Sequence, residues 1–104
     1  MPKPLQGGHV DGLILAVLAD GPRHGYAVIE ELRSRSDGVL DFPEGTIYPA
    51  LYRLEAAGAV ASSWTIADGR RRRMYRLTAA GRRRLVRARE EWDSLARAME
   101  GVFA

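Results

Sequence analysis

A run of arginines in the second half of this sequence is its most distinctive chemical feature. Ten Arg and no Asp or Glu lie between residues 70 and 89, and four of them are consecutive, Arg70 to Arg73. Guanidinium groups packed this closely repel one another unless they are solvated or paired with a polyanion. Two interpretations follow, a solvated loop or a surface that binds the phosphates of nucleic acid.

The net charge of +3 conceals a difference between the two parts of the chain. Residues 1–69 carry five Lys or Arg against nine Asp or Glu, whereas residues 70–104 carry eleven Arg against four acidic residues. The basic character, with an isoelectric point near 9.8, is therefore local to the second part.

Other kinds of chemistry lack suitable residues. Without Cys, the chain has no disulfide, thiolate nucleophile or Cys-ligated zinc. The two His, His9 and His24, fall in different expected elements, so we expect no metal and no cofactor. We also expect no enzymatic activity, because paired carboxylates, a nucleophile with its base and a phosphate-binding glycine loop are all missing from their required contexts.

The length of 104 residues, 46% hydrophobic and 28% charged, indicates a single soluble domain. No apolar run approaches the roughly 20 residues of a membrane span, and residues 1–8 lack the core of a signal peptide. We therefore expect a cytoplasmic protein that has no contact with a membrane.

Helical periodicity predicts two helices at the start of the chain. The buried face of the first comprises Val10, Leu13, Ile14, Val17 and Leu18, and Asp20-Gly21-Pro22 ends it. The second should span about residues 24–34 and bury Tyr26, Ile29 and Leu32.

A third helix should follow Pro43-Glu44-Gly45, with Ile47, Leu51 and Leu54 as its core stripe. Proline is tolerated in the first helical turn, so Pro49 implies a start near Gly45 or Thr46. The opposite face would present hydroxyl groups and one guanidinium that suit phosphates and base edges, on Thr46, Tyr48, Pro49, Tyr52 and Arg53. The alternative for Tyr48 and Tyr52 is packing against neighbouring helices.

The remaining chain predicts a hairpin and a long helix. Strands over about residues 59–66 and 72–78 flank Asp68-Gly69, a strong turn signal, so that Arg70 to Arg73 would lie at the tip. We expect Trp64 to pack in the first strand. The helix that begins at Thr78 has apolar residues at alternating spacings of three and four, at Leu85, Ala88, Trp92, Leu95, Met99 and Val102. This stripe, left exposed on a monomer, predicts a homodimer.

Together these elements predict a mainly α fold with a two-stranded β-wing. Residues 1–78 would form a winged helix-turn-helix DNA-binding domain, and residues 79–104 a C-terminal dimerisation helix within the same compact unit. In this arrangement the third helix enters the major groove and the wing contacts phosphates. Two-fold symmetry would place two such helices about 34 Å apart on a roughly palindromic double-stranded operator.

Three segments resemble the PadR family of bacterial transcription regulators over roughly residues 9–92: LILAVLADGPRHGYAVIEEL, EGTIYPALYRLEAAGAV and RRRMYRLTAAGRRRL. The resemblance implies a dimeric winged-helix regulator, usually a repressor, that releases DNA when a small molecule or another signal shifts its shape. It also implies that Tyr26, Thr46, Tyr48, Pro49 and the wing serve DNA binding or its supporting frame. Tyr26 is either a core residue or a phosphate contact.

The single helix after the wing resembles that of the smaller family members. In some of these a Trp stacks on flat aromatic ligands beside the dimer interface, which makes Trp92 a candidate contact for a small aromatic effector. The alternative, which we favour, is a plain interface anchor.

A second class of function is an adaptor, in which the winged helix binds protein partners. An adaptor has no need for the hydroxyl-rich face of the third helix, and this feature favours the DNA-binding interpretation.

Overall fold

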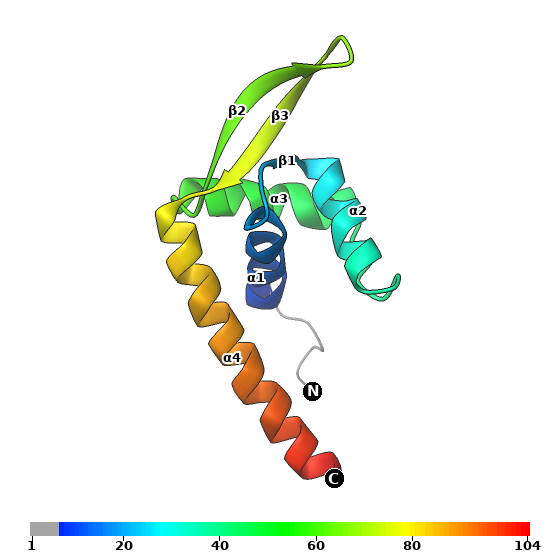
Figure 1. The fold of residues 1–104 in the computed structure, drawn as a ribbon, viewed down its shortest axis with the longest axis vertical. Coiled ribbons are helices and arrows are strands. Elements are labelled where there is room, and N and C mark those ends of the chain that lie inside the picture. The colour runs from blue at the N-terminus through cyan, green and yellow to red at the C-terminus, as the bar shows by residue number, and fades with distance from the viewer. Residues whose placement is uncertain (1–6) are drawn as a thin grey trace.

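The computed structural model describes residues 7–104, so residues 1–6 of the expected polar arm lie outside the described part. It contains three short helices, a small antiparallel sheet and a long final helix (Figure 1). The elements in chain order are α1 (Gly7–Leu18), β1 (Arg23–His24), α2 (Gly25–Arg35), α3 (Glu44–Ala56), β2 (Val60–Ala67), β3 (Arg70–Leu77) and α4 (Ala79–Phe103). The winged helix architecture predicted from the sequence is confirmed.

Helix α1 is the centre of the core and contacts α2, α3, β3 and α4. Ile14 and Leu15 are fully buried, and Val10, Val17 and Leu18 are nearly so. The predicted stripe is therefore correct except for its edge. Leu13 is only partly buried, because it faces a surface pocket, and Leu15 takes its place in the core.

Helix α2 corrects the prediction for Tyr26, which is 48% exposed. The buried residues of α2 are Gly25, Val28, Ile29 and Leu32. Periodicity places Tyr26 on the same side as Ile29, but it lies in the first turn, where Gly25 rather than Tyr26 faces the neighbouring helix α3. The core interpretation of Tyr26 is therefore wrong.

Helix α3 buries Ile47, Ala50, Leu51 and Leu54, as its apolar spacing predicts. It begins at Glu44, with Pro43 as its N-cap, so Pro49 lies in the second turn rather than the first. The prediction of a start near Gly45 or Thr46 was wrong by one residue or two. Pro49 lacks the N–H that would bond one turn back, and its exposed position on α3 keeps the ring out of the core.

The sheet has three strands in the order β1-β3-β2, one more than predicted. The added strand β1 has only two residues, Arg23 and His24, which pair with Tyr75 and Met74 and attach the start of α2 to the base of the wing. The hairpin turn is confined to Asp68 and Gly69, both at positive φ. Arg70 to Arg73 therefore lie along β3 instead of at the tip, because the ladder continues to the pair Ala67 and Arg70.

Helix α4 begins at Ala79 and is capped by Thr78, whose hydroxyl accepts a hydrogen bond from Gly81 N–H at 3.0 Å. Only Gly81 and Leu85 of this helix are buried, and its C-terminal half extends away from the other elements (Figure 1). Ala88 is half-buried, whereas the rest of the predicted seam is exposed on the single chain, at Trp92, Leu95, Met99 and Val102. Within residues 7–104, no helix is both long and apolar enough to cross a membrane.

Candidate nucleic-acid interface

The four wing arginines are divided between the two faces of the hairpin. Side chains alternate along a strand, and cross-strand partners share a face. Arg71 and Arg73 pair with Ile66 and Trp64 on one face, whereas Arg70 and Arg72 pair with Ala67 and Thr65 on the other. The wing therefore offers guanidinium groups on both sides.

On the first face the arginines stack on Trp64. The guanidinium carbons of Arg71 and Arg73 lie 4.7 and 5.3 Å from the indole centroid, within the range of cation–π attraction. Arg73 also donates to Ser62 Oγ at 2.9 Å and lies 3.6 Å from Glu55. Trp64 packs in the first wing strand, but against these two arginines rather than in the core, and it stays 56% exposed.

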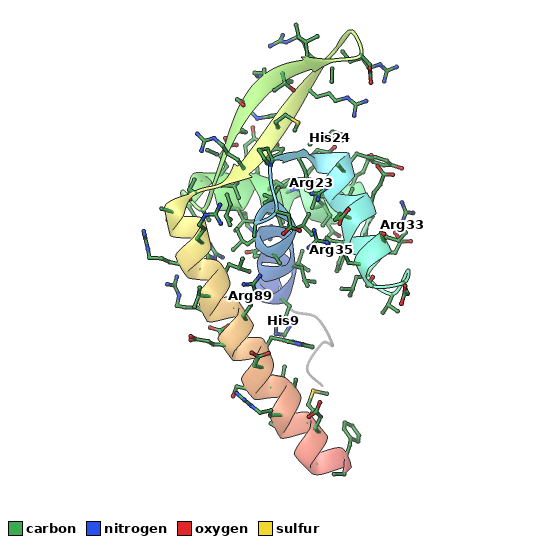
Figure 2. The ribbon with its side chains drawn as sticks, viewed as in Figure 1. His9, Arg23, His24, Arg33, Arg35 and Arg89 are labelled. Atoms are coloured by element: carbon green, nitrogen blue, oxygen red, sulfur yellow. The ribbon has the colours of Figure 1, made fainter. Side chains whose placement is uncertain are left out.

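On the second face Arg72 meets His24 at the base of the wing, where Figure 2 labels the imidazole. Arg72 Nη1 lies 2.9 Å from His24 Nε2. The other ring nitrogen, Nδ1, accepts a hydrogen bond from Ala27 N–H at 3.2 Å and so caps α2. Partial burial and the charge of Arg72 lower the pKa of His24, while Glu30 opposes the shift. The neutral ring therefore predominates near pH 7.

The exposed face of α3 begins beside this histidine. The Tyr48 ring occupies the space that a side chain at position 25 would need, since a Cβ on Gly25 would lie 2.5 Å from Tyr48 Cε1. Burial and then Glu44 raise the pKa of Tyr48, opposed by a hydrogen bond with the Tyr26 backbone and by Arg72. Tyr48 is 39% exposed and keeps its hydroxyl proton at neutral pH.

The other residues predicted on this face of α3 reach solvent to different degrees. Tyr52 is 75% exposed and Pro49 is exposed, whereas Thr46 is partly buried. Tyr52 therefore does not pack against a neighbouring helix, whereas Tyr48 packs against the start of α2 and keeps part of its ring exposed.

Arg53 is tied to the protein interior. Its Nη2 lies 3.1 Å from Oδ1 of Asp11, and Arg84 Nη2 of α4 lies 3.2 Å from Oδ2 of the same carboxylate. Asp11 is the buried charged residue of the core, with 8% exposure, and joins α1, α3 and α4. The sequence analysis missed this link, although an acid beside Val10 on an apolar helix face is a signal for a buried ion pair.

A pocket of about 440 Å³ brings the wing arginines together with His24, Tyr26 and Tyr48. Three elements that are separate in the sequence contribute to it: the start of α2, the start of α3 and the wing. The lining residues are His24, Gly25, Tyr26, Glu44, Tyr48, Arg70, Arg71, Arg72, Arg73 and Tyr75. Its lining residues include four arginines, one acid and three tyrosines, and this basic character suits an anion such as phosphate. No three His, Asp or Glu residues within 7–104 gather closely enough to bind a metal ion.

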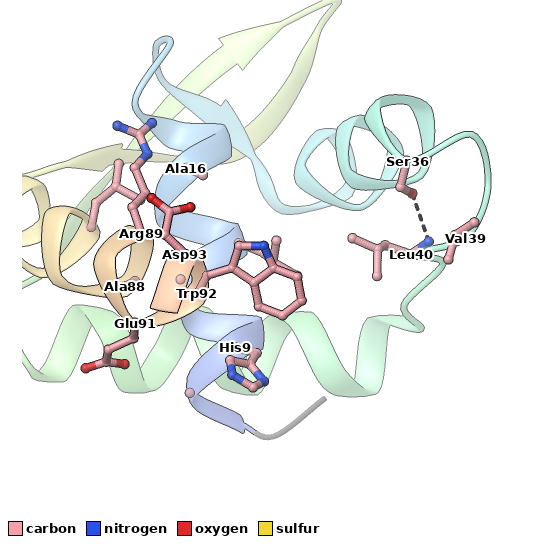
Figure 3. Close-up of a pocket in the computed structure, with 14 residues that line it drawn as sticks. His9, Ala16, Ser36, Val39, Leu40, Ala88, Arg89, Glu91, Trp92 and Asp93 are labelled. Atoms are coloured by element: carbon pink, nitrogen blue, oxygen red, sulfur yellow. Dashed lines mark hydrogen bonds between the residues drawn. The ribbon is translucent and has the colours of Figure 1, made fainter. Parts of the chain in front are cut away.

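A second pocket, of about 500 Å³, lies on the opposite side of α1, between α4 and the connection from α2 to α3. Trp92 projects from α4 toward His9, with Val39 and Leu40 across the pocket (Figure 3). The rings of His9 and Trp92 meet edge to face at 5.8 Å and 83°. Most of the other lining groups are apolar, as in sites that bind small organic molecules.

These features define the chain as a winged helix protein of the kind that regulates transcription. The model of the transcriptional regulator PadR-like family matches residues 14–87. A curated relative, transcriptional regulator Rv3488 of Mycobacterium tuberculosis, is 42% identical over 88 residues, which cover 85% of this chain and 79% of that protein. The chain belongs to the PadR-like family of transcriptional regulators, and the resemblance found in its sequence is confirmed.

Solved structures agree with this assignment. A PadR family transcription regulator from Clostridium difficile matches with a TM-score of 0.81 and 30% identity over 92% of this chain and 99% of that chain. A transcriptional regulator from Clostridium thermocellum matches with a TM-score of 0.83 and 31% identity over 90% and 92% of the two chains. Both likenesses extend well beyond the family match, so nearly all of this fold recurs in those regulators.

Proposed function

We propose that this transcriptional regulator is a homodimeric, sequence-specific DNA-binding protein that represses its target gene until a signal releases it. The observation that carries the proposal is the basic pocket in which the wing arginines meet the start of α3. A winged helix that binds duplex DNA needs a helix end for the major groove and cations for the adjacent backbone. Both lie on one surface here.

Within this interface the residues divide by chemistry. Arg70, Arg71, Arg72 and Arg73 supply backbone contacts and most of the affinity. Thr46, Tyr48, Pro49 and Tyr52 form the surface of α3 that approaches the groove, and Tyr26 adds an exposed hydroxyl at the start of α2. Arg53 holds α3 in position through Asp11 and can reach a phosphate with the exposed part of its side chain.

Dimerisation is proposed to use the exposed stripe of α4. Leu95 and Met99 are 39% and 47% exposed on the single chain, and Val102 is 82% exposed. Burying apolar area releases about 25 cal/mol per Å². Because the stripe continues from the buried Leu85 and half-buried Ala88, a partner helix laid along it extends the existing core.

The signal is proposed to act at the pocket beside Trp92, whose volume lies in the range of small-molecule sites. A flat aromatic compound can stack on the indole, and the pocket adjoins both α1 and α4, the elements that Asp11 connects to α3. The alternative role for Trp92 is an anchor in the dimer interface.

The experiment that tests the proposal is selection of bound sequences from a pool of random duplex DNA at two salt concentrations. We expect a palindromic motif to be enriched. Salt-sensitive retention without a motif would reduce the protein to a nonspecific binder. Absence of retention would reject DNA binding and favour an adaptor that binds protein partners.

Two variants then test whether the wing belongs to the DNA interface. Replacing Arg70 to Arg73 with Ala should weaken binding to every sequence and lower the slope of log K against log salt by about 0.9 for each lost phosphate contact. The control is Arg97→Ala, which removes one exposed charge from α4 outside the proposed interface. An unchanged slope in the wing variant would remove the wing from the interface.

A further inference from the structure

His24 has a conflict between its two hydrogen-bond partners. A neutral imidazole has one N–H and one lone pair. Its Nδ1 faces Ala27 N–H at 3.2 Å, and its Nε2 faces Arg72 Nη1 at 2.9 Å. Both partners are donors, because arginine has no acceptor. One lone pair therefore serves two donors, and the ring N–H must face a second N–H.

The helix cap decides which contact is mismatched. Ala27 N–H belongs to the first turn of α2 and has no partner within the helix. His24 Nδ1 is therefore the natural acceptor for it, as at other helix N-caps. The proton then lies on Nε2 and points toward Arg72. Two donors therefore face each other across 2.9 Å at the edge of the basic pocket.

The 2.9 Å between the two nitrogens leaves no room for an atom on the line that joins them, but one acceptor placed to the side, within hydrogen-bond distance of both, would satisfy both donors. The pocket is lined by four arginines against one acid, Glu44, and so favours an anion over a neutral acceptor. The groups that face His24 are Arg72 from β3 and Glu30 from its own helix.

We propose that His24 and Arg72 together bind one phosphodiester group of the DNA backbone, His24 through a neutral Nε2–H and Arg72 through its charge. The proposal rests on the proposed function and adds a residue that the sequence analysis left out of the interface. It also gives β1 a role, because this short strand fixes His24 beside β3. Occupation of the site would fix the wing against the start of α2.

The two residues should leave different signatures in binding to the selected operator. His24→Asn keeps a side-chain acceptor for the helix cap, but its shorter side chain places no donor at the position of Nε2. Affinity should fall about tenfold or more with little change in salt slope, since the lost donor is neutral. Arg72→Ala should lower affinity and also reduce the slope by about 0.9. The control is Arg33→Ala at the far end of α2. It should change the slope of log K against log salt less than Arg72→Ala does.

Operators that carry a neutral methylphosphonate at single positions test whether His24 and Arg72 contact the same phosphate. Among the positions that weaken binding by the unmodified protein, one should lose its effect in both His24→Asn and Arg72→Ala. The double variant should bind more tightly than the product of the two single losses predicts. Independent, additive effects at different phosphates would overturn the proposal, as would unchanged affinity of His24→Asn.

The failure of this proposal differs from the failure of DNA binding. If the unmodified protein binds its operator but the two variants respond independently, only the shared site is rejected. If it retains no DNA, a titration with inorganic phosphate decides the site through the ¹⁵N resonance of His24 Nε2. A shift that disappears in Arg72→Ala would support an anion site, and an unshifted resonance would reject it.

Discussion

Replacing Asp11 with Ala tests the idea that one carboxylate holds α3 and α4 in position against α1. Asp11 accepts from Arg53 of α3 and Arg84 of α4 through its two oxygens, at 3.1 and 3.2 Å. Its side chain is only 11% exposed, whereas those of Arg53 and Arg84 are 57% and 38% exposed. After the substitution, both guanidinium groups can be solvated, so the main loss is the two hydrogen bonds.

The size of this loss follows from the exposure of the partners. Hydrogen bonds to charged groups contribute about 1.5–3 kcal/mol when desolvated, and solvent around half-exposed arginines reduces each to about 1 kcal/mol. We expect Asp11→Ala to lower the free energy of unfolding by about 2 kcal/mol. For a domain of this size that corresponds to a fall of about 10 °C in Tm. Asp11→Asn keeps one acceptor and should lose about half as much.

Urea unfolding followed by circular dichroism at constant protein concentration measures these changes. The control is Glu31→Ala, because Glu31 also lies beside two arginines, Arg23 at 3.7 Å and Arg35 at 2.8 Å, but at the surface. Its loss should change stability much less. Equal losses for Asp11→Ala and Glu31→Ala would refute the argument that burial gives the Asp11 link its strength.

Three further predictions concern α4, Gly25 and pH. Leu95→Glu should dissociate the proposed dimer in sedimentation experiments, whereas Val86→Glu, on the opposite face of α4, should not; equal behaviour would reject the stripe as the interface. Gly25→Ala should force Tyr48 aside and cost about 1 kcal/mol in chemical unfolding, and an unchanged Tyr48 ring in NMR spectra would contradict this. Because the folded protein lowers the pKa of His24, its contribution to stability is complete above the unfolded pKa of about 6.5 and is lost as pH falls through the lower folded value. Unfolding experiments between pH 7 and about pH 5 should show this fall, and His24→Asn should show less of it.

The sequence predicted those parts of the fold that depend on local patterns. The apolar spacing of Ile47, Leu51 and Leu54 identified α3, and the Asp68-Gly69 turn identified the hairpin. The two-residue strand β1 has no periodicity to detect, because it exists only through pairing with β3. Tyr26 was misplaced for a related reason: periodicity gives a helix face, but not where the neighbouring helix stops covering it.

The candidate site was predicted in composition but not in arrangement. The arginine run and the exposed tyrosines of α3 were identified from their residue types. The Asp11 link and the contact of His24 with Arg72 join residues 42 to 73 positions apart, and no local pattern encodes such pairs. His24 gave no local signal of its capping role either, because Ser, Thr, Asp and Asn are the side chains that usually cap a helix.

The stacking of Arg71 and Arg73 on Trp64 has a consequence for the thermodynamics of association. A long side chain that becomes immobilised on binding loses about 0.5–1.5 kcal/mol of conformational entropy. Contact with the indole restricts both side chains before any partner arrives. Part of the ordering is therefore completed during folding, and the wing meets a polyanion with its cations already positioned.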